Sequence, residues 1–164
     1  MADLAKVMGL DVPAGGVPTK EFFVPLVYAG EDPWFIYGDF YTFAMTTIND
    51  HCHFDFKVPH DFTTLTHCKF VYITRCDATP GSWDWTVTTD FAADGETYNI
   101  HSDSDTGNNE AFALSANQMT TLDISAAFTG LAADDYVGVK VNMDAINGTG
   151  VKYVYPLGLV FKYS

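Results

Sequence analysis

An alternation of apolar and polar residues with a period of two runs through most of the chain, from Glu21 to Tyr163. Turn-forming residues interrupt it roughly every 8 to 15 positions, a spacing typical of a β-sandwich or barrel. Because successive side chains of a strand point to opposite faces, each such segment predicts a strand with one buried face. The pattern therefore favours antiparallel sheets over an α/β arrangement.

The clearest of these segments is Tyr136 to Asp144, where valine and methionine alternate with glycine and polar residues. Asn147 and Gly148 follow it, and we expect them to form a two-residue type I′ hairpin turn because both tolerate positive φ. The other expected strands cover residues 21–24, 35–48, 51–57, 66–75, 83–91, 120–124 and 151–163.

Residues 92–118 lose the alternation and are rich in Asp, Asn, Ser and Gly. We expect a long irregular loop there, with room for a short helix or strand around residues 109–114. A single helical turn is expected at residues 126–131, after the strand at 120–124.

The expected fold is all-β, a two-sheet antiparallel sandwich of the jelly-roll type with about eight strands. An immunoglobulin-like sandwich is the alternative, although the Cys and Trp spacing of antibody domains is missing. The domain should cover residues 21–164. Residues 1–20, which contain two prolines and several glycines, predict an extended N-terminal arm that is either disordered or laid across a neighbour.

Charge limits the possible partners, because 21 acidic residues stand against 8 basic ones and the formal net charge is −13. Such a chain repels the phosphates of nucleic acid and the headgroups of anionic lipid, so we expect neither as a partner. The N-terminus lacks the features of a secretory signal. Cys52, Cys68 and Cys76 are expected to be reduced and buried, which is consistent with assembly inside a cell.

Motifs of known catalytic sites are absent from the sequence, including the Gly-x-Ser-x-Gly elbow and the phosphate-binding Gly-x-x-x-x-Gly-Lys loop. Acidic pairs such as Asp134-Asp135 are expected by chance in so acidic a chain. We therefore expect a protein that is not an enzyme and uses no cofactor.

Two groups of residues have partial metal-ligand character. His51 and His53 share one strand face, but Cys52 between them points to the other, so we expect no metal there. Oxygen ligands gather in residues 101–110, but their spacing departs from that of a calcium loop, and a solvated acidic loop is the preferred interpretation. The candidate calcium ligands are Asp103, Asp105 and Glu110.

Trp34, Trp83 and Trp85 offer a further alternative, since exposed indole rings on a sandwich can stack on sugar rings. Trp83 and Trp85 share a strand face with Val87, so packing in the core explains them at least as well.

A resemblance to known proteins appears when three stretches of the sequence are read together: residues 56–65, 85–98 and 122–139. They resemble small jelly-roll structural proteins of tailed phages and related uncultured viruses, over roughly Glu21 to Tyr163. The resemblance implies a virion component, often a trimer, that acts as a capsid decoration (cement) protein or as part of a fibre or spike. It implies no catalytic residue.

The first functional hypothesis is therefore a non-enzymatic viral structural protein, a capsid decoration protein that binds the outside of the shell and stabilises it. We expect a homo-oligomer, with a trimer favoured, whose partners are the major capsid protein or other virion proteins. Its location would be the virion, after assembly in the host cytoplasm. The expected subunit or shell contacts are Leu4, Val7, Val12, Val17, Phe22, Phe23 and Trp34.

The second hypothesis is a carbohydrate-binding or receptor-binding β-sandwich module of a fibre or spike. It would use Trp34, or Trp83 and Trp85, together with the loop at residues 92–118.

Overall fold

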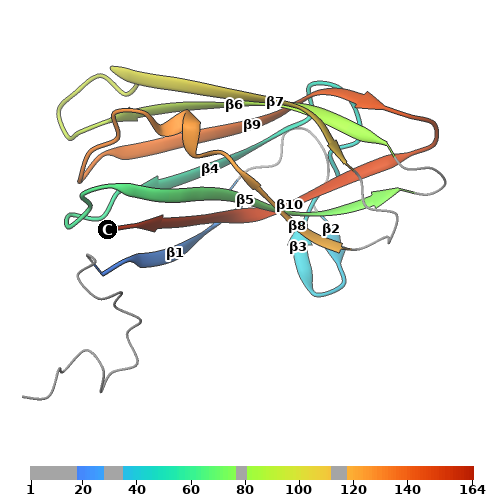
Figure 1. The fold of residues 1–164 in the computed structure, drawn as a ribbon, viewed down its shortest axis with the longest axis horizontal. Helices are drawn as coiled ribbons and strands as arrows, with labels where there is room; N and C mark the ends of the chain where they lie inside the picture. The colour runs from blue at the N-terminus through green and yellow to red at the C-terminus, as the bar shows by residue number, and fades with distance from the viewer. Residues whose placement is uncertain (1–17, 28–34, 77–80, 112–117) are drawn as a thin grey trace, which may run out of the picture.

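The computed structural model describes residues 18–27, 35–76, 81–111 and 118–164 (Figure 1). Most of these residues lie in strands, and one short 3-10 helix, η1 (Ser125–Phe128), agrees with the expected helical turn. The strands are β1 (Lys20–Pro25), β2 (Phe35–Tyr37), β3 (Phe40–Thr42), β4 (His51–Lys57), β5 (Leu65–Cys76), β6 (Ser82–Ala92), β7 (His101–Ala111), β8 (Gln118–Asp123), β9 (Tyr136–Asn147) and β10 (Lys152–Tyr163).

Eight of the strands form two four-stranded antiparallel sheets, in the orders β1-β10-β5-β8 and β4-β9-β6-β7. Between β4 and β10, consecutive strands change sheets at each step except β6 to β7, which pair directly. This order is that of a jelly roll, so the predicted all-β sandwich is confirmed. In Figure 1 the two sheets lie one above the other, with β1 at the lower edge.

The hydrophobic core lies between the two sheets, on the faces that the alternation predicted. On β9 the buried residues are Val137, Val139, Val141 and Met143. Aromatic rings fill the end of the core near the C-terminus, where Phe161 lies 5.1 to 6.0 Å from the ring centroids of Phe22, Phe56 and Phe62. Burial of this apolar surface is the main stabilising contribution to such a domain.

Trp83 and Trp85 are both buried in this core. The stacking of sugars on these two indole rings, proposed from the sequence, is therefore wrong. The two residues lie on the same inward face of β6 because side chains two positions apart on a strand point the same way, and the register shift between Asp84 and Trp85 in the pairing with β9 leaves this unchanged.

The expectation of an irregular segment at residues 92–118 is also wrong, because β7 occupies residues 101–111 within it. This strand is an edge of its sheet and pairs with β6. The inward side chains of this edge strand, such as Asp103 and Asp105, are only half-buried, so polar residues are tolerated there and the apolar-polar alternation is weak. Residues 112–117 lie outside the described part of the chain.

Two turns differ from the expectation. The predicted strand at residues 35–48 is instead a hairpin of β2 and β3, closed by Gly38 with a φ of 61°, followed by an isolated bridge from Met45 to Val154. The turn after β9 lies where it was predicted, but Asn147 stays in the strand and the positive φ values fall on Gly148 and Gly150. The connection is thus wider than a two-residue type I′ turn.

The β2–β3 hairpin packs on the outer face of the β10 sheet. The ring of Tyr37 stacks on that of Tyr155 at a centroid distance of 4.3 Å, and the Thr42 hydroxyl donates to the carbonyl of Pro156 at 2.6 Å. These contacts bury Tyr155, which is not part of the core cluster between the sheets, unlike its neighbour Val154.

The three cysteines form no disulfide. Cys52 and Cys68 are buried as expected, whereas Cys76 is only half-buried. Within the described residues, no helix has the length and hydrophobicity needed to cross a bilayer.

Candidate functional site

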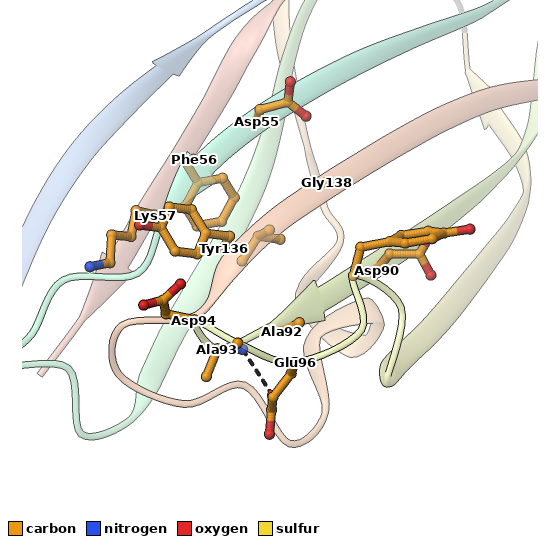
Figure 2. Close-up of a pocket in the computed structure, with 13 residues that line it drawn as sticks. Asp55, Phe56, Lys57, Asp90, Ala92, Ala93, Asp94, Glu96, Tyr136 and Gly138 are labelled. Atoms are coloured by element: carbon orange, nitrogen blue, oxygen red, sulfur yellow. Dashed lines mark hydrogen bonds between the residues drawn. The ribbon is translucent and has the colours of Figure 1, made fainter.

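A groove with a volume of about 710 Å³ lies on the outer face of the β4-β9-β6-β7 sheet (Figure 2). Its walls come from the end of β4, the start of β9, the end of β6 and the loop that joins β6 to β7. The volume is within the range of small-ligand sites, which are typically concave and carry a few convergent polar groups.

The floor of the groove is a row of residues across three neighbouring strands. Asp55 of β4 pairs with Gly138 of β9, and Gly138 pairs in turn with Asp90 of β6. Figure 2 shows Asp55 and Asp90 on opposite sides of the strand that carries Gly138. Since adjacent strands lie about 4.8 Å apart, the two aspartate Cα atoms are about 10 Å apart. Two carboxylates thus flank a stretch of bare backbone.

Two tyrosines line the groove from different elements. Tyr136 begins β9 and is 56% exposed, whereas Tyr98 lies in the β6–β7 loop and is 75% exposed. Tyr98 and Tyr136 are the two exposed aromatic side chains among the residues that line this concavity.

The β6–β7 loop is held by local hydrogen bonds. The Glu96 carboxylate accepts from the backbone N–H of Ala93 at 2.9 Å, and the N–H of Ile100 donates to the carbonyl of Thr97 at 2.9 Å. Gly95 takes a φ of 86°, which a residue with a Cβ rarely adopts. The loop therefore consists of defined turns that position Glu96 and Tyr98 at the groove.

Carboxylates dominate the charge of the groove. Its acidic lining residues are Asp55, Asp90, Asp94 and Glu96, and its one cationic lining residue is Lys57. The Lys57 ammonium lies 3.1 Å from the carboxylate of Asp134, which is not part of the lining, and 5.2 Å above the ring centroid of Tyr136. Lys57 is therefore already paired, and the groove keeps a negative potential.

Asp134 also joins Lys57 to His60. The His60 ring nitrogen Nδ1 lies 2.6 Å from the Asp134 carboxylate. Hydrogen bonds with His60 and Lys57 lower the pKa of Asp134, and the same bonds raise the pKa values of His60 and Lys57. This network fixes the Lys57 side chain beside Tyr136.

Of the residues expected from the sequence to make subunit or shell contacts, the structure describes Phe22 and Phe23, and neither lines this groove. Phe22 packs against the core and Phe23 lies exposed on the edge strand β1. The remaining candidates, Leu4, Val7, Val12, Val17 and Trp34, lie outside the described residues. Their role in contacts stays a prediction.

The structure also shows where the residues considered as metal ligands on β4 lie. His51 and His53 share the outer face of β4 and Cys52 is buried on the inner face, as the alternation predicted. In the part of the chain that the structure describes, no group of three or more His, Cys, Asp or Glu side chains is arranged to hold a metal ion.

The candidate calcium ligands lie in a regular strand and not in a loop. Asp103 and Asp105 belong to β7, and the Asp103 carboxylate accepts hydrogen bonds from the backbone N–H groups of Ser104 and Thr129 at 2.8 Å. Asp103 thereby ties β7 to the end of η1.

Sequence reasoning did not single out the groove residues. Asp55 and Gly138 were assigned to the polar faces of their strands, and Tyr98 fell in a segment expected to be irregular. One signal was present, because Gly138 interrupts the polar face of an otherwise regular strand. The register that brings Gly138 between two aspartates is visible only in the folded chain.

No protein-family model matches the sequence, and no curated protein matches it. Among solved structures, the chain is similar to a low-affinity xylan-binding module, CBM86, from the xylanolytic gut symbiont Roseburia intestinalis. The match covers 91% of this chain and 97% of that one, at 8% sequence identity and a TM-score of 0.39.

Proposed function

We propose that this protein is a non-catalytic, carbohydrate-binding β-sandwich and that the groove over β9 is its sugar site. The observation that carries the proposal is the combination of two exposed rings, Tyr98 and Tyr136, with the row Asp55-Gly138-Asp90 in a single concavity.

The chemistry of a sugar ring suits this arrangement. A pyranose has an apolar C–H face, which packs on an aromatic ring, and a rim of hydroxyl groups, which need acceptors. A carboxylate accepts O–H donors in short, charge-assisted hydrogen bonds. Tyrosine adds contact area at a small cost in conformational entropy, because its side chain has few rotatable bonds. Asp55 and Asp90 would thus hold hydroxyls at opposite edges of a ring.

The environment of the carboxylates favours binding over catalysis. A glycosidase needs one carboxylic acid that stays protonated, which usually requires an apolar pocket around it. Asp55 and Asp90 are both exposed on the surface of the sheet. Their carboxyl oxygens are accessible to a ligand as hydrogen-bond acceptors.

Isothermal titration calorimetry and affinity electrophoresis test the proposal, using neutral xylan, β-glucan, mannan and galactan with the full chain. Tyr98→Ala and Tyr136→Ala should each weaken binding by about tenfold or more, as expected for truncation of an aromatic anchor. Tyr41→Ala is the matched control, because Tyr41 is also exposed but lies on the β2–β3 hairpin. Wild-type protein that binds none of these glycans, or tyrosine variants that bind like wild type, would contradict the proposal.

One observation favours a second function, that of a capsid decoration protein. The β2–β3 hairpin carries three exposed hydrophobic residues close together in sequence: Ile36, Phe40 and Tyr41, which are 68%, 44% and 65% exposed. Exposed apolar patches of this kind mark protein contact surfaces. Light scattering tests this function. A decoration protein should be a trimer as the full chain, and the double variant Ile36→Ser with Phe40→Ser should be a monomer. A monomer at all concentrations would argue against it.

A further inference from the structure

Gly138 differs from the other glycines of the described residues in having no structural requirement for glycine. Five of those others have positive φ: Gly38, Gly95, Gly130, Gly148 and Gly150. Three more would place a Cβ within 2.5 Å of a neighbouring atom: Gly81, Gly107 and Gly158. Gly138 has neither feature. A Cβ atom at Gly138 would lie 3.8 and 4.0 Å from its two nearest atoms, which are ordinary contact distances.

Glycine at this position weakens the fold. Gly138 lies within β9, a central strand with partners on both sides, where a β-branched residue would be favoured. Glycine there gains no side-chain packing and loses more backbone entropy on folding than any other residue. A site at which the backbone must stay uncovered would account for a glycine that the fold does not require.

We infer that Gly138 is the floor of the sugar subsite, where one ring lies flat on the β9 backbone between Asp55 and Asp90. The same subsite selects uncharged sugars over acidic ones. This inference rests on the proposed function. A glycine inside a strand often marks a place where a ligand approaches the backbone closely. A side chain at this position would fill the space between the two carboxylates.

The selection against acidic sugars follows from the same geometry. A ring on Gly138 lies between two carboxylates and near two more, Asp94 and Glu96, while Lys57 is held by Asp134. The carboxylate of a uronic acid would approach these groups with no free cation among the lining residues to offset it. Like charges in such a position cost binding free energy, and more so at low salt.

The experiment compares pairs of oligosaccharides that differ only at C6: β-1,4-glucan with β-1,4-glucuronan, and β-1,4-mannan with β-1,4-mannuronan. Titration calorimetry with wild-type protein should show the neutral member bound about tenfold or more tightly at low salt, and a smaller ratio at high salt. Asp55→Asn with Asp90→Asn should reduce that ratio, because the amides keep hydrogen-bonding capacity without the charge.

The variants Gly138→Ala and Gly138→Val test whether Gly138 is the floor of the subsite. Lys140→Val is the control, because Lys140 lies on the same face of β9 but outside the groove. We expect Gly138→Val to lose about tenfold or more in affinity for the neutral glycan and Gly138→Ala to lose less. The Tm of Gly138→Ala should stay the same or rise by about 1 to 4 °C, so that lost binding is not lost folding. Lys140→Val should bind like wild type.

The outcomes separate the two proposals. Equal affinity for neutral and acidic members, or Gly138→Ala and Gly138→Val variants that bind like wild type, would overturn this inference and leave the proposed function standing. Absence of binding to all four glycans, together with no binding to xylan or galactan, would remove the proposed function and this inference with it.

Discussion

Trp85 and Gly107 are cross-strand partners, and the indole ring of Trp85 lies directly on the Gly107 backbone. A Cβ atom at residue 107 would come within 2.3 Å of the ring. The bulky indole of Trp85 on β6 thus fits because Gly107 on β7 has no side chain. This pair helps to explain why so polar a segment as residues 101–111 is held as an edge strand.

Replacing Gly107 by Ala should therefore destabilise the domain. Overpacking of this kind costs about 1 to 3 kcal/mol, because either the ring or the edge strand must move. For a domain of this size the Tm should fall by several degrees, on the order of 2 to 10 °C. Thermal unfolding followed by circular dichroism measures it. Gly138→Ala is the matched control, and an equal loss of stability in both variants would show that the ring contact is not the cause.

The two core tryptophans should be inaccessible to solvent. In a Trp34→Phe variant, fluorescence comes from Trp83 and Trp85 alone, both of which are buried. We expect blue-shifted emission that acrylamide quenches weakly, and a red shift with strong quenching once urea unfolds the chain. Strong quenching in the native state would contradict the placement of these rings between the sheets.

His60 and His53 should titrate on opposite sides of the ordinary histidine pKa of about 6.5. The hydrogen bond and charge of Asp134 raise the pKa of His60, whereas burial and then the nearby His51 lower that of His53. Histidine side-chain NMR over a pH series measures both midpoints. In Asp134→Asn the His60 midpoint should fall towards the ordinary value, and His53 should not change.

The same shifts set the direction of the pH dependence of stability. Because the pKa of His60 is raised by folding, its contribution is present below the unfolded pKa and is lost as the pH rises through the folded pKa. For His53 the pKa is lowered, so its protonation opposes folding as the pH falls below the unfolded value. Denaturant unfolding of His60→Gln and His53→Gln across pH 5 to 8 should show opposite trends relative to wild type.

The thiols should differ in reactivity. Burial raises the pKa values of Cys52 and Cys68, so little reactive thiolate forms at either site. We expect Ellman's reagent to modify at most Cys76 in the native protein, and all three thiols after unfolding. Rapid native-state reaction in a Cys76→Ser variant would contradict the burial of the other two.

Much of the fold could be predicted from the sequence because strand residues face alternately inward and outward. The valines of β9 and the Cys52 and Phe54 side chains of β4 lie on the predicted core face. The sandwich class follows from the same rule, since several one-faced strands must bury their apolar sides against one another. The pattern did not predict β7, because its inward side chains are only half-buried and its sequence is mostly polar.

The sequence by itself determined which side chains are core and which are surface, because that information is local to each strand. Only the tertiary structure decided which surface residues become neighbours. Asp55, Asp90 and Gly138 are far apart in the chain and adjacent only through the register of three strands that do not follow one another in sequence. Such a register depends on long-range packing of the whole sandwich, so a site built across strands cannot be seen in any one of them.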